Sequence, residues 1–231
     1  MVSYAPMVKH VVYVAPFFME ASLRFLQGAL SLDGVRVSLI SQDPVERLPA
    51  GLRQQLVGHW RVANGLDATQ IAEGVKKLEK TLGEVSRVFG PLEQLQVPLA
   101  MVREMLGIEG LGVQAAQNFR DKAQMKTVLA DAGVPCARHQ LIADEAAAWR
   151  FVEKTGFPVV VKPPAGAGGK STFRLDNKQD LQSFLHRNVP DPAKPALYEE
   201  FVAGKEYSFD SVIIGGRPVW YSISSYQPTP L

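Results

Sequence analysis

The stretch from Phe157 to Thr172, FPVVVKPPAGAGGKST, is the feature that most constrains what this chain can fold into. It opens with an apolar, β-branched segment that ends in Lys162. Glycines let backbone N–H groups approach an anion closely, and lysines neutralise its charge. The pattern therefore predicts a buried strand that delivers a phosphate-binding loop, although glycine-rich loops also form ordinary turns. The loop residues concerned are Gly166, Gly168, Gly169, Lys170 and Ser171.

Lys162 directly follows three valines. A lysine in that position is costly to bury unless its charge is paired. The alternative is that its ammonium group reaches water at the end of the strand while the stem stays apolar. The cost of burial favours a functional role.

A helix precedes this stretch, within NFRDKAQMKTVLADAGVPCARH at residues 118–139. Asn118 is the expected N-cap, Asp121 lies in the expected first turn, and Phe119 belongs to the expected apolar face. Gly133 ends the helix. Lys122 lies on its polar face, where an isolated lysine is usually solvated.

Paired glutamates follow the loop, within LYEEFVAGKEYSFDSVIIGGRPVW at residues 197–220. Glu199 and Glu200 stand on a predicted strand, so their side chains point to opposite faces and one of them faces solvent. Glu206 comes after a glycine and has an ordinary alternative as an exposed partner of Lys205. No single motif is a strong match.

Taken together, the helix lysine, the strand lysine, the glycine-rich loop and the Glu-Glu-aromatic-aliphatic and Gly-x-Glu motifs resemble the ATP-grasp superfamily, especially its carboxylate–amine ligases. The resemblance covers the second half of the chain well and the first half only in pattern. It implies an ATP-dependent ligase that joins a carboxylate to an amine through an acyl-phosphate. The substrate class implied is an amino acid or peptide, and the cofactors implied are ATP and Mg²⁺.

The resemblance also implies roles for single residues. Lys122 resembles the first phosphate-contacting lysine, and Lys162 resembles the second, which also approaches the adenine. Residues 165–171 resemble the flexible loop that closes over the β- and γ-phosphates. Ser171 departs from the pattern, because many relatives have glycine there.

On the nucleoside side, the resemblance makes Glu199 the acceptor for the adenine amino group. The backbone at Glu200 and Val202 is expected along the purine edge. Glu206 is expected to bind the ribose hydroxyls. All of these residues belong to ATP binding, and none is assigned a catalytic role.

The first half alternates strands with helices, which predicts a parallel sheet with right-handed crossovers. The turn after the first strand, at residues 16–19, is Pro-Phe-Phe-Met and has no G-x-G-x-x-G, so the phosphate cradle of a dinucleotide-binding domain is missing. The expected strands are residues 11–15, 35–40 and 85–89, and the expected helices are residues 21–30, 68–81 and 92–106.

The expected fold class is α/β: a Rossmann-like pre-ATP-grasp domain over residues 1–112, then an incomplete ATP-grasp domain over residues 113–231. The second domain contains a small α+β lid over about residues 141–195. A hairpin is predicted around Gly215-Gly216-Arg217. The other expected elements of this half are helices 144–154 and 178–187 and strands 158–162 and 171–175.

In the family, the ligands of Mg²⁺ lie on strands beyond that hairpin, and no Asp or Glu follows Asp210 here. We therefore assign no catalytic and no metal-binding residue, interpret the chain as shortened, and expect no ligase turnover from it alone. The alternatives are a non-catalytic nucleotide-binding or interaction module, and a biotin-carboxylase-like or purine-biosynthetic enzyme.

A net charge of +2 without a basic cluster argues against a nucleic-acid partner. The single cysteine, Cys136, suits a reducing compartment, and no apolar run approaches the length of a membrane span. The expected partners are small-molecule carboxylates and amines, the expected location is the cytoplasm, and an exposed sheet edge would favour a homo-oligomer or another partner.

Overall fold

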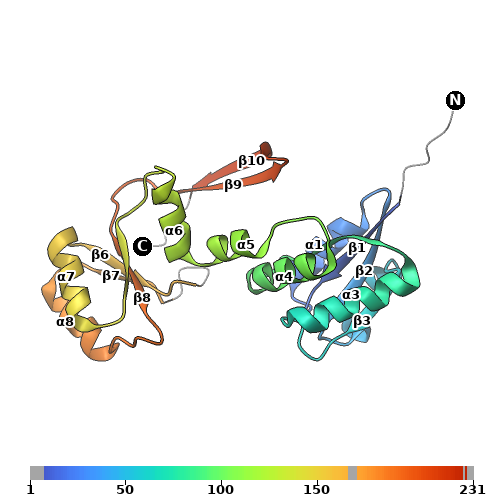
Figure 1. The fold of residues 1–231 in the computed structure, drawn as a ribbon, viewed down its shortest axis with the longest axis horizontal. Coiled ribbons are helices and arrows are strands. Elements are labelled where there is room, and N and C mark those ends of the chain that lie inside the picture. The colour runs from blue at the N-terminus through green and yellow to red at the C-terminus, as the bar shows by residue number, and fades with distance from the viewer. Residues whose placement is uncertain (1–7, 166–170, 226, 228–231) are drawn as a thin grey trace. The chain divides into compact units, whose positions relative to one another are not determined.

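The computed structural model describes residues 8–165, 171–225 and 227. The chain forms two compact units, Met1–Arg120 and Asp121–Leu231, and each has its own sheet (Figure 1). The predicted α/β class is confirmed. We expected the boundary after Gly112, whereas the first unit also includes the helix α5 (Val113–Arg120), because α5 packs against α4 (Gln96–Leu106).

The first unit is built on a parallel four-stranded sheet in the order β3-β2-β1-β4. Three of its strands were predicted. The fourth, β3, was not, because GHWR has no apolar run and lies at the edge of the sheet. The strands are β1 (Lys9–Val14), β2 (Val35–Ser41), β3 (Gly58–Arg61) and β4 (Val85–Phe89).

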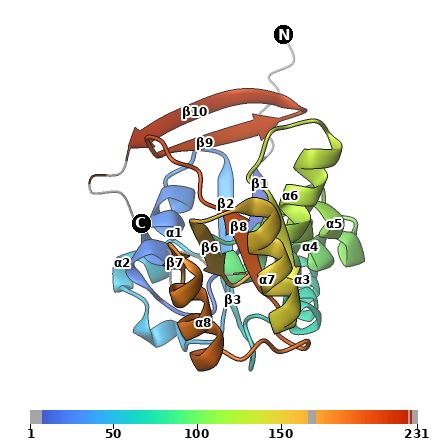
Figure 2. The same ribbon diagram turned by 90° about the vertical axis from the view of Figure 1, so that its left-hand side faces the viewer.

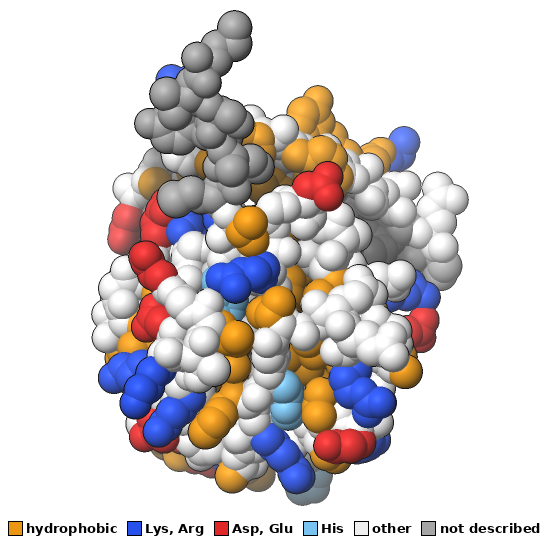
Figure 3. Space-filling view, turned by 90° about the vertical axis from the view of Figure 1, so that its right-hand side faces the viewer, with side chains coloured by type: hydrophobic (Ala, Val, Ile, Leu, Met, Phe, Trp, Pro, Cys, Tyr) orange, Lys and Arg blue, Asp and Glu red, His pale blue; other side chains and the backbone are white. Residues whose placement is uncertain are grey.

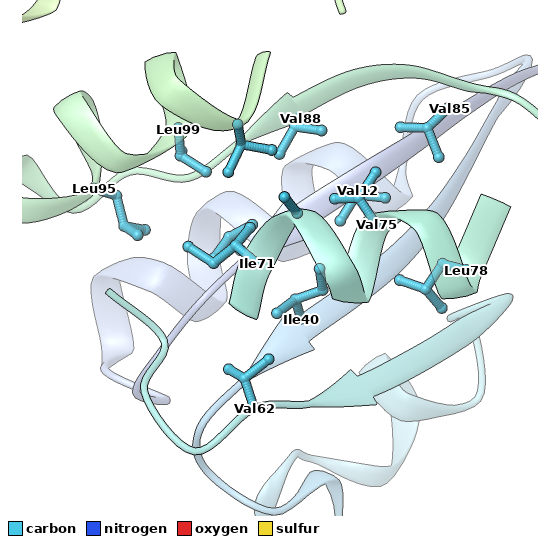
Figure 4. Packing of buried hydrophobic residues seen from close by; sticks show 13 residues of the cluster. Val12, Ile40, Val62, Ile71, Val75, Leu78, Val85, Val88, Leu95 and Leu99 are labelled. Atoms are coloured by element: carbon cyan, nitrogen blue, oxygen red, sulfur yellow. The ribbon is translucent and has the colours of Figure 1, made fainter. Parts of the chain in front are cut away.

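Helices cover both faces of this sheet, as buried parallel strands require. Val12 and Val14 of β1 pack with residues of α3 and α4, whereas Tyr13 and Ala15 pack with Leu26 of α1. Figure 4 shows the first of these cores. The remaining elements are α1 (Glu20–Leu30), α2 (Ala50–Arg53), α3 (Ala68–Leu82) and the 3₁₀ turns η1 (Val45–Arg47) and η2 (Glu93–Leu95).

The second unit contains an antiparallel four-stranded sheet in the order β5-β8-β6-β7. Its core lies between one face of the sheet and the helices α7 and α8, while α6 lies on the other side (Figure 1). The elements are α6 (Lys122–Asp131), β5 (His139–Ile142), α7 (Glu145–Thr155), β6 (Val159–Lys162), β7 (Phe173–Leu175), α8 (Lys178–Arg187) and β8 (Ala196–Glu200).

The predicted start of the helix near residue 118 is wrong. Asn118 lies inside α5, and the N-cap of α6 is Asp121, whose carboxylate accepts hydrogen bonds from the backbone N–H groups of Ala123 and Gln124. The expected apolar face fails as well, because Phe119 is 73% exposed. A carboxylate satisfies two free N–H groups at once, so Asp121 is the better cap.

The predicted hairpin is confirmed as β9 (Tyr207–Ile214) and β10 (Arg217–Ser225), which pair only with each other among the described residues (Figure 2). Gly215 and Gly216 have φ values of 57° and 75°, as a two-residue hairpin turn requires. Large apolar side chains on both strands are exposed: Tyr207, Phe209, Ile213, Trp220, Tyr221 and Ile223.

Lysines and arginines are interspersed with acidic and apolar side chains on the face shown in Figure 3, which fits the small net charge. Within the described part of the chain, every helix is too short or too polar to cross a bilayer.

Candidate functional site

The predicted strand lysine meets a buried carboxylate. Glu199 of β8 stands directly opposite Val160 of β6, so Lys162, two residues further along β6, lies on the same face in the diagonal position. The Nζ atom of Lys162 is 2.7 Å from Oε2 of Glu199. The Glu199 side chain is 8% exposed and that of Lys162 is 23% exposed, so both charges are largely withdrawn from water. The ion pair with Glu199 offsets the desolvation cost of burying the Lys162 ammonium group.

A second lysine approaches the same carboxylate from α6. The Nζ atom of Lys126 is 3.4 Å from Oε1 of Glu199, and its side chain is 12% exposed. The three side chains therefore form a cluster of two ammonium groups and one carboxylate, which we call the Lys126–Glu199–Lys162 cluster. Lys126 was not identified from the sequence, although its position one helical turn after Lys122 was an available signal.

Lys122 lies at the start of α6, directly after the cap Asp121. Its backbone N–H donates a hydrogen bond to the carbonyl of Pro164, 2.9 Å away, which ties the first turn of α6 to the segment that follows β6. The two lysines predicted to bind phosphate, Lys122 and Lys162, are thus carried by segments that are bonded to each other.

The neighbouring glutamate, Glu200, points elsewhere, as strand alternation predicted for one member of the pair. Its carboxylate accepts hydrogen bonds from the backbone N–H and the guanidinium of Arg138. These bonds hold the pKa of Glu200 below its ordinary value. The backbone N–H of Glu200 donates to the carbonyl of Arg138 at 2.9 Å.

The other predicted nucleoside contacts, Val202 and Glu206, lie on the exposed segment between β8 and β9, and Val202 is 67% exposed. Ser171 has a φ of 58°, in the left-handed region that favours glycine. This explains why glycine would suit its position. The other predicted loop residues, Gly166, Gly168, Gly169 and Lys170, lie outside the described residues.

A cavity of about 530 Å³ lies at the same end of the sheet. Val161, Phe173, Phe184 and Tyr198 line it, and burial raises the pKa of Tyr198 to about 12. Val161, Phe184 and Tyr198 belong to the core on the α7 and α8 side. Lys162 reaches the lining, but Lys126 and Glu199 do not, so the cavity shares one residue with the Lys126–Glu199–Lys162 cluster.

The described residues do not fit a magnesium site. No group of three or more His, Cys, Asp or Glu side chains in the described ranges is placed to hold a metal ion. Glu199, the buried carboxylate, is already paired with two lysines. The cluster therefore suits the binding of an anion and a hydrogen-bond donor, and no metal-dependent step can be derived from these residues.

Comparison with known proteins agrees with this chemistry. Residues 121–205 match the family model of the carbamoyl-phosphate synthase L chain, ATP binding domain. A D-alanine–D-alanine ligase from Desulforudis audaxviator (strain MP104C) is 30% identical over 158 residues, which are 68% of this chain and 48% of the ligase. The chain belongs to the ATP-grasp superfamily.

Solved structures show that ATP-grasp architecture extends over both units. The L-amino acid ligase from Bacillus licheniformis superposes with a TM-score of 0.71 at 18% identity, over 96% of this chain and 52% of that one. The MgADP-bound biotin carboxylase domain of the Hydrogenobacter thermophilus 2-oxoglutarate carboxylase superposes with a TM-score of 0.65 at 22% identity, over 87% and 46%. The chain spans about half the length of the relatives it matches.

Proposed function

We propose that this chain binds ATP through its second unit and acts in a ligase that joins a carboxylate to an amine. The observation that carries the proposal is the Lys126–Glu199–Lys162 cluster, which lies inside the segment that matches an ATP-binding family model. A buried cluster with one excess positive charge suits a polyanionic ligand that also carries a donor group.

In this proposal the ammonium groups of Lys122 and Lys162 bind phosphate oxygens. Glu199 accepts a hydrogen bond from the adenine amino group, and the backbone near Glu200 and Val202 borders the purine. Glu206 accepts hydrogen bonds from the ribose hydroxyls, and its exposed position leaves it accessible to them. The predicted loop, including Gly166, Gly168, Gly169, Lys170 and Ser171, covers the phosphates.

The proposed reaction has two steps. A carboxylate oxygen attacks the γ-phosphorus of ATP, which releases ADP and forms an acyl-phosphate, and the amine then attacks the acyl carbon and releases phosphate. The protein contributes mainly by positioning the reactants and stabilising charge. An amino acid is the proposed carboxylate substrate, because the relatives include a D-alanine–D-alanine ligase and an L-amino acid ligase.

A second candidate function is a biotin-carboxylase-like or purine-biosynthetic activity. It is favoured by the structural likeness to a biotin carboxylase domain and to the phosphoribosylglycinamide synthetase from Anaerococcus prevotii, which has a TM-score of 0.64. Both likenesses are below 25% identity, so they support the fold that the candidates share more than either activity.

Calorimetric titration with a non-hydrolysable ATP analogue tests the proposal. Charge-assisted contacts to phosphate contribute about 1.5–3 kcal/mol, so Lys162→Ala should weaken binding by about tenfold or more. The matched control is Lys178→Ala, which removes an exposed lysine on α8 and should leave the affinity unchanged. Equal affinities of the wild type and Lys162→Ala would contradict the assignment of Lys162 to phosphate binding.

A further inference from the structure

The two oxygens of the Glu199 carboxylate are in different situations. Oε2 is 2.7 Å from Nζ of Lys162, which is a hydrogen-bonding distance. Oε1 is 3.4 Å from Nζ of Lys126, and it is buried without a hydrogen bond from any described residue. Lys126 therefore holds Oε1 by charge and leaves its acceptor capacity unused.

An unused acceptor on a buried carboxylate is uncommon, because buried polar atoms are almost always hydrogen-bonded. An ionised carboxylate has only acceptor sites, so the group that completes Oε1 must be a donor. Lysine at 3.4 Å fixes the oxygen from one side without filling its lone pairs. The arrangement leaves Oε1 prepared for an N–H group of a ligand.

We propose that Lys126 is a positioning residue that holds Oε1 of Glu199 in place for the exocyclic amino group of a purine, and so sets the preference for a 6-amino over a 6-oxo base. This inference rests on the proposed ATP-binding function. A 6-oxo group presents an acceptor to the same oxygen, so two acceptors would face each other and the contact would be repulsive. Lys126 acts through Glu199 and needs no contact with the nucleotide.

The test compares two non-hydrolysable triphosphates whose bases differ in the group at position 6 and in the proton that the 6-oxo base carries on N1, the adenosine and the inosine imidotriphosphates. Their dissociation constants are measured by calorimetry for the wild type and for Lys126→Met, which keeps an apolar stem of similar length. A hydrogen bond to a charged group changes a dissociation constant by about tenfold or more. The wild type should therefore bind the adenine analogue at least that much more tightly than the inosine analogue. In Lys126→Met the preference should fall about fivefold, through weaker binding of the adenine analogue alone.

Two further variants sharpen the test. Lys126→Arg keeps the charge and should keep the preference, while Gln124→Met changes an exposed residue of the same helix and should change nothing. Should Lys126→Met fail to fold, Lys126→Leu carries the test, because it also removes the charge beside Oε1 and should lower the preference by a similar factor.

The outcomes separate this inference from the function on which it rests. A wild type that binds neither analogue overturns the proposed ATP site itself. A wild type that prefers adenine, with an unchanged preference in folded Lys126→Met, overturns the role of Lys126 alone. An equal loss for both analogues also overturns it, because that result places Lys126 on the phosphates or in the general stability of the site.

Discussion

The buried polar side chains of the described residues differ between the two units. The first unit buries His10, Ser22, Ser38 and Ser41, whereas the second buries Glu199. His10 donates from Nδ1 to the carbonyl of Gly83 at 2.9 Å, and its Nε2 shares a hydrogen bond with Ser38 at 2.7 Å. Both ring nitrogens of His10 are therefore satisfied within the first unit.

Glu199 contrasts with His10. Its charge is balanced by more cations than it needs, and one of its oxygens has no hydrogen bond among the described residues. A buried polar group whose hydrogen bonds are all made within the protein stabilises the fold. A buried charge with an unused hydrogen-bond acceptor costs stability and is suited to binding a ligand. Ser22 Oγ of the first unit also lacks a hydrogen-bond partner among the described residues, but it carries no charge. The contrast supports the proposal that the second unit binds the nucleotide.

The largest expected effect comes from removing the carboxylate. Glu199→Ala should lower the unfolding free energy of the second unit by about 3 kcal/mol, because two partly buried lysines lose their shared partner. Urea titration with hydrogen exchange read out on β6 and β8 measures this change. Glu153→Ala, at an exposed position of α7, is the control. Equal urea midpoints for the two variants would contradict the energetic importance of the cluster.

His10→Ala should destabilise the first unit without changing the affinity for the nucleotide. Loss of one buried and one partly buried hydrogen bond, and of the buried ring, should destabilise the first unit by about 2 kcal/mol. At a temperature where the variant is folded, its affinity for the ATP analogue should equal that of the wild type. Thermal denaturation and calorimetry measure the two quantities. A severalfold loss of affinity would break the distinction between scaffold and binding unit.

The hairpin offers a third test, because apolar residues with no cover in the described structure promote association. Phe209 and Tyr221 stack with their ring centroids 5.7 Å apart, and both are 64% exposed. Tyr221→Lys should weaken self-association of the chain about tenfold, as measured by sedimentation velocity. Leu32→Lys changes an apolar residue in the first unit that is 58% exposed and should have no effect. A wild-type chain that stays monomeric would contradict this expectation.

The smallest effect concerns Glu200, whose pKa is lowered by the hydrogen bonds from Arg138. A carboxyl with a lowered folded-state pKa stabilises the fold above its unfolded value, about 4.3, and this contribution is lost as the pH falls through the folded-state pKa. Glu200→Gln should therefore be about 0.5 kcal/mol less stable than the wild type at pH 7. Urea unfolding from pH 7 to pH 3 should show the difference shrinking, and a constant difference would exclude the ion pair as its source.

The central strands and amphipathic helices of both units were predictable, because their apolar residues repeat with the period of each element. The helix predicted over residues 144–154 is α7, and the carboxylate of its N-cap Asp144 accepts a hydrogen bond from the N–H of Ala147. The missed strands, β3 and β5, lie at sheet edges, where one side of the strand is unpaired and no apolar run is needed. Asn118 was chosen over Asp121 because the break between α5 and α6 leaves no glycine or proline in the sequence.

For the site, Lys162 was predicted because it follows three valines, and Glu199 because of the resemblance to the ATP-grasp superfamily. Their pairing, and the addition of Lys126, depends on strand register and on the packing of α6, neither of which is visible in local sequence. Strand alternation predicts that Glu200 points to the face opposite Glu199. It does not predict the partner of Glu200, because Arg138 lies on a segment distant in the sequence. Spacing therefore predicts which residues are candidates, and tertiary structure decides which of them meet.

Hydrogen exchange with and without the ATP analogue tests whether the second unit binds the nucleotide, because it reads both units in one experiment. We expect slower exchange in β6, β8 and the first turn of α6 when the analogue is bound, and unchanged exchange in β1 and β2. Lys162→Ala should remove the protection at the same analogue concentration. Protection confined to β1 and β2, or none in β6 and β8 at saturating analogue, would contradict nucleotide binding by the second unit.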